Sequence, residues 1–221
     1  MNRKTGLLVA TLISTLPSSA LRCALYRLTF GYSINNASIG FGTVIFASSV
    51  TLDQCRRGRF NRFLGPMSVS VGLRANIESH NVFDCGDWAA DAEHADHYDR
   101  TLNIGADTFI TNYHFFDIAG ELSIGAGTWI AGRGSQFWTH GVNATDRNIS
   151  IGKQCYIGSA VRFAPGSGVG DNIIVGIGSV VTKRVNCSNA LVAGSPAKVL
   201  KEGCGWKTLK NVESPVHSPI E

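Results

Sequence analysis

Aliphatic and aromatic residues recur at every sixth position through the C-terminal half of the chain. Residues 151–186 divide into the units IGKQCY, IGSAVR, FAPGSG, VGDNII, VGIGSV and VTKRVN, and each unit opens with an apolar residue. A helix repeats its apolar face near every 3.6 residues and a strand at every second residue, so a period of six predicts short strands separated by regular corners. Glycine at the second position of most units allows a tight bend. The pattern therefore predicts an all-β coil with three sides to each turn.

The six-residue step holds more weakly from residue 34 onward and is interrupted three times. The first interruption carries four arginines, the second carries six carboxylates, and the third exceeds the period by nine residues. We expect the chain to leave the coil at these places, near 52–68, 84–101 and 135–149. Loops on a rigid scaffold often carry binding and catalytic groups. The length fits one domain, with the coil at 34–201 and a tail at 202–221.

Residues 1–33 lack the period of six. Leucines recur at helical spacing on both sides of Pro17, which predicts a short helical segment that packs against the coil. The cationic start, apolar run and small residues of 1–20 also fit a signal peptide, although the run is too short to span a bilayer comfortably. A peripheral contact with a membrane through residues 1–33 is a third interpretation.

Composition narrows the functional classes. The net charge of +4 suits a polyanionic ligand, but no dense Lys/Arg tract indicates nucleic acid. Six cysteines without a C-x-x-C pair indicate neither a zinc site nor a disulfide scaffold, and they favour a reducing compartment. His94 and His97 lie among carboxylates without a fixed ligand spacing, so no metal site is predicted.

The I-G-x-x-x-x repeat, followed by GSVVTKRV and AGSPAKVL, resembles the hexapeptide-repeat acyltransferases over roughly residues 34–201. The resemblance implies a left-handed parallel β-helix that uses acetyl-CoA. It also implies a homotrimer with a cleft between subunits. The implied location is the cytoplasm, and a peripheral contact with the inner face of the membrane is compatible with it. The handedness rests on the family alone. The Leu-rich, LPSS-containing N-terminal segment is similar to that of sugar O-acetyltransferases in this family, which predicts a sugar or oligosaccharide acceptor in surface polysaccharide biosynthesis.

The resemblance also implies the catalytic base. His140 follows an I-G-x-x-x-x-I-A segment by about ten residues, where the family carries a histidine that deprotonates the acceptor hydroxyl. A histidine near its ordinary pKa suits this task at neutral pH. The residue that orients it stays open among Asp117, Asn143 and Asp146. His114 and His80 are competing bases.

Binding residues follow from the same motifs. Asn112, which matches an asparagine of the family, His114 and Trp138 are the predicted acceptor contacts, and the flat face of Trp138 suits the axial C–H groups of a sugar. A structural role for His114 and an anchoring role for Trp138 in its loop are the alternatives. The donor is predicted to lie along backbone groups of the coil, with lysines meeting its phosphates. The predicted donor residues are Ser159, Ile177, Thr182, Lys183, Lys198 and Lys201.

Three other functions remain open. An N-acetyltransferase on an amino-sugar nucleotide would use the same fold and donor. A γ-type carbonic anhydrase would need three metal-binding histidines, for which His80, His114 and His140 supply the number but not the expected spacing. A scaffold without catalysis would keep the repeat and lose both the His140 base and the donor lysines.

Overall fold

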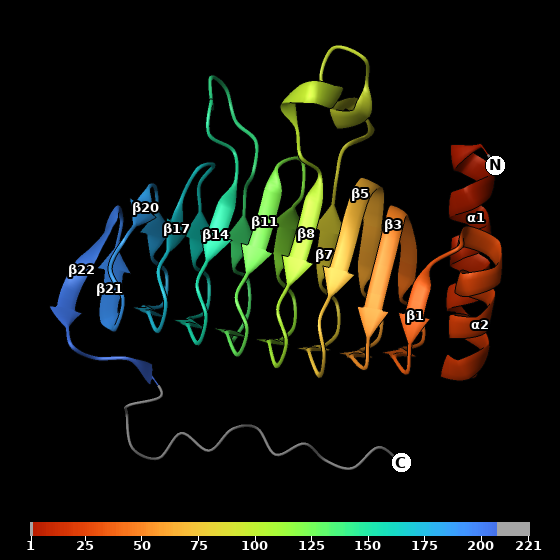
Figure 1. Cartoon of the computed structure of the whole chain (residues 1–221), viewed down its shortest axis with the longest axis horizontal. Helices are drawn as coiled ribbons and strands as arrows, with labels where there is room; N and C mark the ends of the chain where they lie inside the picture. The colour runs from red at the N-terminus through yellow and green to blue at the C-terminus, as the bar shows by residue number, and fades with distance from the viewer. Residues whose placement is uncertain (1, 207–221) are drawn as a thin grey trace.

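The computed structural model describes residues 2–206, and the chain winds there as a parallel β-coil with three faces (Figure 1). Near-side strands in Figure 1 point downward while successive turns advance from the N-terminal end at the right to the left, so the coil is left-handed. The predicted left-handed β-helix is therefore confirmed. Most of the tail predicted at 202–221 lies outside the described residues.

Each turn of the coil contributes one strand to each face. Face 1 contains β1 (Ser33–Asn35), the second halves of β3 (Val44–Asp53) and β5 (Arg62–Val71), β8 (Thr101–Ile104), β11 (Glu121–Ile124), β14 (Ile149–Ile151), β17 (Gly168–Val169) and β20 (Arg184–Val185). Face 2 contains β2 (Ser38–Ile39), β4 (Arg56–Arg57), β6 (Asn76–Ile77), β9 (Phe109–Ile110), β12 (Trp129–Ile130), β15 (Tyr156–Ile157), β18 (Ile174–Val175) and β21 (Ala190–Gly194). Face 3 contains the first halves of β3 and β5, β7 (Val82–Asp84), β10 (Phe115–Asp117), β13 (Gln136–Phe137), β16 (Arg162–Phe163) and β19 (Val180–Val181). The final strand, β22 (Ala197–Glu202), pairs antiparallel with β21.

The interior of face 3 is a column of stacked phenylalanines. Phe63, Phe83, Phe116, Phe137 and Phe163 lie one above another, with ring centroids 4.4 to 5.1 Å apart and interplanar angles of 12° or less. Each ring is essentially buried. The inward positions of successive strands in a parallel coil are in register, so like residues stack along its axis. This column supports the strands from which the functional residues project.

The departure predicted near 52–68 is wrong, because the chain stays on the coil there. Arg57 takes the inward position on face 2, in register with Ile39 on one side and Ile77 on the other. Its side chain is 4% exposed and donates to the Cys55 sulfur at 3.0 Å. Arg57 occupies a position that is usually apolar, so it breaks the hydrophobic pattern of the sequence, but the β-coil continues through it.

Two helices cover the N-terminal end of the coil (Figure 1). Asn2 caps α1 (Arg3–Ser14) and Ser18 caps α2 (Ser19–Phe30), each by accepting a hydrogen bond from a backbone N–H of the first turn. Tyr26 of α2 is fully buried, and its hydroxyl accepts a hydrogen bond from the Ile45 N–H. Within residues 2–206, no helix combines the length and hydropathy needed to cross a bilayer.

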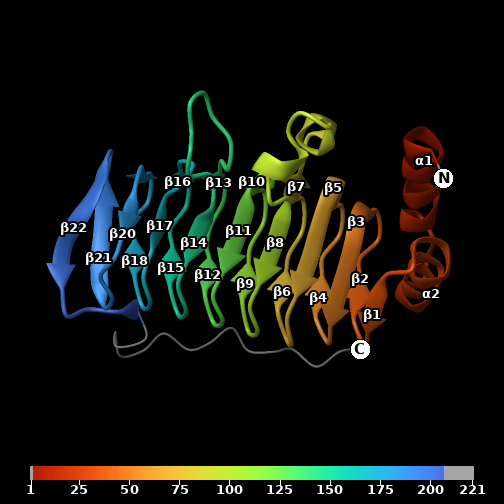
Figure 2. The same ribbon diagram turned by 45° about the horizontal axis from the view of Figure 1, so that its top comes forward.

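The chain leaves the coil at the edge where face 3 turns into face 1. Residues 85–100 form a detour after β7, with short 3₁₀ helices at Asp87–Ala90 and Ala95–His97, and residues 138–148 form a loop after β13. Figures 1 and 2 show both segments rising from the same edge of the prism. We call residues 85–100 the detour and residues 138–148 the His140 loop.

Candidate active site

A buried carboxylate fixes the imidazole of His140. Nδ1 of His140 lies 2.8 Å from Oδ2 of Asp117, which also accepts the Thr139 backbone N–H at 2.7 Å. The Asp117 side chain is 7% exposed and the His140 side chain is 41% exposed. Among the three orienting partners left open by the sequence, the structure brings only Asp117 into hydrogen-bond contact with the ring. The participation of Thr139 had no signal in the sequence.

This contact determines which ring nitrogen of His140 carries the hydrogen and which one is left free to accept a proton. A backbone N–H can only donate, so Oδ2 of Asp117 is an acceptor, and the hydrogen of the His140 bond sits on Nδ1. Nε2 of the neutral ring is then an acceptor, and it has no hydrogen-bond partner within residues 2–206. The pair therefore presents one exposed basic nitrogen.

Two indoles flank this imidazole. The ring of Trp88, from the detour, lies 5.4 Å from the His140 ring, and the ring of Trp138 lies 6.4 Å from it. Trp138 also packs against Phe115 at 4.8 Å. Both indoles are about one-third exposed, at 37% and 36%. Trp138 thus lies beside the predicted base, and its contact with an acceptor stays a prediction. The Trp88 contact was missed because the detour has no repeat pattern.

The structure places His114 in the interior, which speaks against its predicted contact with the acceptor. The side chain is 2% exposed. Its Nδ1 accepts the Ser135 N–H at 3.1 Å, so Nε2 carries the hydrogen and donates to Thr111 Oγ1 at 3.0 Å. Both ring nitrogens are engaged, and the residue is a neutral structural histidine.

We expect His114 to make the fold sensitive to acid. Burial lowers the pKa of His114 to about 4, below the value of about 6.5 in an unfolded chain. Between these values the unfolded chain binds the extra proton, so stability falls as the pH drops below 6.5. The loss between pH 7 and 4.5 should be roughly 2 kcal/mol. Urea unfolding at both pH values should show this loss in the wild type and a smaller one in His114→Asn, whereas equal losses would contradict it.

Asn112 and His80 lie on a different edge from His140, where face 2 turns into face 3. Asn112 donates to Glu78 Oε2 at 2.6 Å and accepts the Ser79 N–H at 2.8 Å. It lines an open groove of about 490 Å³ on face 2. His80 is stacked between Phe60 at 5.3 Å and Tyr113 at 4.8 Å. One chain alone therefore does not bring the predicted acceptor residue Asn112 to the His140 base.

The six predicted donor residues fall into three groups. Ser159 and Ile177 lie on the edge between faces 2 and 3, where the Ser159 carbonyl accepts the Gly178 N–H at 2.9 Å. Thr182 and Lys183 lie on the edge that carries His140, between β19 and β20. Lys198 and Lys201 are exposed on β22. A single chain does not gather these residues into one pocket.

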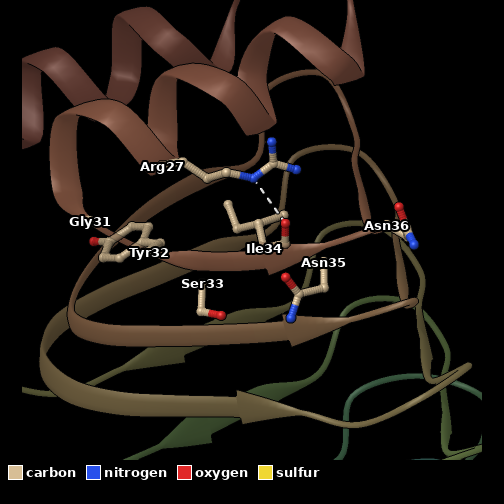
Figure 3. A pocket seen from close by; sticks show the side chains of 7 residues that line it. All are labelled: Arg27, Gly31, Tyr32, Ser33, Ile34, Asn35 and Asn36. Carbon is tan, nitrogen blue, oxygen red and sulfur yellow. Dashed lines mark hydrogen bonds between the residues drawn. The ribbon is translucent and has the colours of Figure 1, made fainter.

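A second hollow lies where α2 meets the first turn of the coil. Its volume is about 430 Å³, and it is lined by Arg27 and by residues 31–36. Figure 3 shows Arg27 reaching toward β1, where its Nε donates to the Ile34 carbonyl at 2.9 Å. The lining contains no histidine, carboxylate or thiol. It therefore offers no group for proton transfer at neutral pH.

Metal coordination finds no support in the described part of the chain. Across residues 2–206, no group of three His, Cys, Asp or Glu side chains is placed to hold a metal ion. The three histidines considered for a carbonic anhydrase are separated: His114 is buried, and His80 and His140 lie on different edges.

Comparison with known proteins finds sequence similarity to acetyltransferases. No protein-family model matches the chain. Galactoside O-acetyltransferase of Escherichia coli (strain K12) is 44% identical over 54 residues, covering 24% of this chain and 26% of that protein. The "Putative colanic acid biosynthesis acetyltransferase WcaF" of the same strain is 36% identical over 93 residues, covering 38% of this chain and 48% of that protein. The resemblance to the hexapeptide-repeat acyltransferases is confirmed.

The fold of this chain is similar to that of a solved structure. The polysialic acid O-acetyltransferase OatWY superposes with a TM-score of 0.53 at 19% identity, covering 86% of this chain and 90% of that one. At this identity the likeness carries the fold alone. The chain spans at most about half the length of the two curated relatives described above, at 26% and 48%.

Proposed function

We propose that the chain is an acetyl-CoA-dependent O-acetyltransferase that acts on a sugar hydroxyl in surface polysaccharide biosynthesis. The observation that carries the proposal is the Asp117–His140 pair, which presents a free Nε2 at a loop edge of the coil. The names of the curated relatives, one a galactoside acetyltransferase and one assigned to colanic acid biosynthesis, support both the reaction and the acceptor class.

The pair suits direct transfer. Nε2 of His140 would take the proton of the acceptor hydroxyl as its oxygen attacks the thioester carbonyl. The Asp117 carboxylate, accepting from Nδ1, would stabilise the imidazolium that forms. Collapse of the tetrahedral adduct would form the ester, break the C–S bond and release the thiolate of coenzyme A. The imidazolium would then return its proton to that thiolate, so no covalent acyl-enzyme is needed.

The donor residues support acetyl-CoA. Lys183, Lys198 and Lys201 would meet its phosphates, while Ser159, Ile177 and Thr182 would contact its pantetheine arm along the coil. Ile177 is 77% exposed, as an apolar contact for an extended ligand would require. Titration of coenzyme A against the purified chain, followed by calorimetry, tests this donor.

The reaction itself is tested by incubating the chain with acetyl-CoA and a panel of neutral sugars, polysaccharide repeat units and amino-sugar nucleotides. Release of free thiol that depends on a hydroxyl acceptor supports the proposal. Release only with amine acceptors would replace it with N-acetylation. No release with any acceptor in the panel, from a chain that binds acetyl-CoA, would count against it.

We further propose that the working unit is a homotrimer with composite sites. Asn112 and His140 lie on different edges of one chain, so they can line one cleft only when a second chain brings its Asn112 edge beside the His140 loop. A closed, symmetric ring of subunits would repeat this contact at every interface. The lining of the groove by Asn112 supports its role toward the acceptor.

Mixed trimers test the composite site. His140→Ala and Asn112→Ala chains should each be nearly inactive alone. Co-expressed at equal levels, they should recover about a quarter of the wild-type activity, because a site needs His140 from one chain and Asn112 from the next. Light scattering should give the mass of three chains. An active monomer, or no recovery in mixed trimers, would contradict this arrangement.

A further inference from the structure

The detour and the His140 loop are bound to each other. The guanidinium of Arg147, in the His140 loop, lies 4.5 Å above the Tyr98 ring of the detour. Asn148 Nδ2 donates to Asp99 Oδ2 at 2.7 Å, and Arg147 also reaches the His97 carbonyl at 3.5 Å. The two segments are some fifty residues apart in the sequence, and these contacts make them one structural unit above the coil.

Contacts at both ends of the detour hold its first 3₁₀ helix in place. Arg100, just before β8, donates to the carbonyls of Ala89 at 2.7 Å and Ala95 at 2.9 Å, which ties the two 3₁₀ helices together. Asp87 forms an ion pair with Arg3 of α1 at 2.5 Å. A side chain at Gly86 would strike the Trp88 indole. The position of Trp88 is thus set by the folded detour.

Trp88 contacts the imidazole of His140 from the side of the detour. The two rings are 5.4 Å apart with an interplanar angle of 68°, a T-shaped contact. Trp88 also packs edge-to-face with Tyr98 at 4.9 Å and with His94 at 5.7 Å. Such aromatic pairs are worth about 0.5–1.5 kcal/mol beyond the area they bury. The Trp88 indole is therefore held in place by the rings of Tyr98 and His94.

We propose that Trp88 is a positioning residue for His140, an inference that rests on the proposed function. Rotation of a histidine ring about its final torsion is broad and weakly restricted. The hydrogen bond to Asp117 fixes one ring nitrogen but leaves the ring free to tilt about that bond. The Trp88 indole restricts this tilt, so Nε2 keeps one direction in the space beside the two loops. The acid-rich detour thus contributes to proton transfer by supplying Trp88, which orients the His140 ring.

Four variants test this role. Trp88→Ala and Trp88→Leu should each lower kcat by about 30-fold and leave the KM for acetyl-CoA nearly unchanged, since a misdirected base costs rate rather than donor binding. Trp88→Phe keeps a ring and should retain at least roughly a third of the wild-type kcat. Trp129→Phe is the matched control, because Trp129 lies on face 2 and stacks on Trp206 at 5.3 Å. An unchanged kcat in both Trp88→Ala and Trp88→Leu would overturn the proposal.

A chemical readout separates this proposal from the proposed function. Diethyl pyrocarbonate modifies a neutral imidazole nitrogen, and mass spectrometry follows the adduct on His140. The rate should rise about threefold in Trp88→Ala and Trp88→Leu, where one flank of the ring is opened, and should stay near the wild-type rate in Trp88→Phe and Trp129→Phe. Equal rates in all variants would overturn the positioning role. If the wild type transferred no acetyl group, the modification rates would still decide whether Trp88 holds the imidazole.

Discussion

Replacing His140 with alanine is expected to lower kcat for acetyl transfer by at least about 10³-fold, near the upper range for loss of a general base. The exposed Nε2 would be lost, and among residues 2–206 no other imidazole is hydrogen-bonded to a buried carboxylate. The variant should keep its oligomeric mass and thermal midpoint, because the His140 side chain is 41% exposed. Thiol release at saturating acetyl-CoA measures the loss.

His97→Ala is the matched control for this experiment. The His97 side chain is exposed in the detour, close to the same edge, and only its backbone carbonyl takes part in the contacts between the two loops. Its kcat should stay within about twofold of the wild type, as for most surface substitutions away from special features. Turnover by His140→Ala at a tenth of the wild-type rate would remove His140 from proton transfer.

Asp117→Asn is expected to lower kcat by about 10²-fold or more while leaving the fold intact. Oδ2 of Asp117 accepts both the Thr139 N–H and the Nδ1–H of His140, so an amide oxygen in its place keeps both hydrogen bonds. The amide carries no charge, however, and no longer stabilises the imidazolium that forms when His140 takes the substrate proton. Asp117→Ala is a poorer test, because it removes the acceptor of the buried Thr139 N–H. A loss of stability would then accompany the loss of activity.

Two measurements distinguish the loss of the Asp117 charge from a structural effect. Nitrogen NMR of the His140 ring should show the hydrogen on Nδ1 in both the wild type and Asp117→Asn, so that a lower kcat reports the lost charge. Asp84→Asn is the control, because Asp84 occupies the register position next to Asp117 on face 3 and makes no hydrogen bond to the His140 ring. Its kcat should remain within about threefold of the wild type. A hydrogen on Nε2 in Asp117→Asn would instead assign the lower kcat to the wrong tautomer, and an unchanged kcat would remove the Asp117 charge from catalysis.

The sequence predicted the coil well where each six-residue unit kept an apolar opening residue, as from Ile151 onward. It failed at Arg57, because a charged side chain in an inward position looks like a loop in a hydrophobic pattern. Backbone pairing with Ile39 and Ile77 keeps that segment on the coil all the same. The six-residue period shows which residue type usually fills an inward position, whereas the backbone pairing of the strands persists when one such position holds a charged residue.

The candidate site was only partly predictable for a different reason. His140 could be selected from its place in a motif, and Asp117 was one of three possible partners. The choice among them needed the register of β10 against β13, which brings Asp117 beneath the start of the His140 loop. Trp88 could not be found, since its contact with His140 joins two loops that both lie outside the period.

The winding of the chain also sets the distance between those loops. The detour follows β7 and the His140 loop follows β13, with β10 as the single face 3 strand between them. Neighbouring strands lie about 4.8 Å apart, so the two loops start roughly 10 Å apart along the axis. The coil changes length in whole turns, such as the eighteen positions that separate the paired Ile151 and Val169. A tandem duplication of one turn between β7 and β13 would move Trp88 out of reach of His140, whereas the same duplication before β7 would lengthen the protein and leave their spacing unchanged.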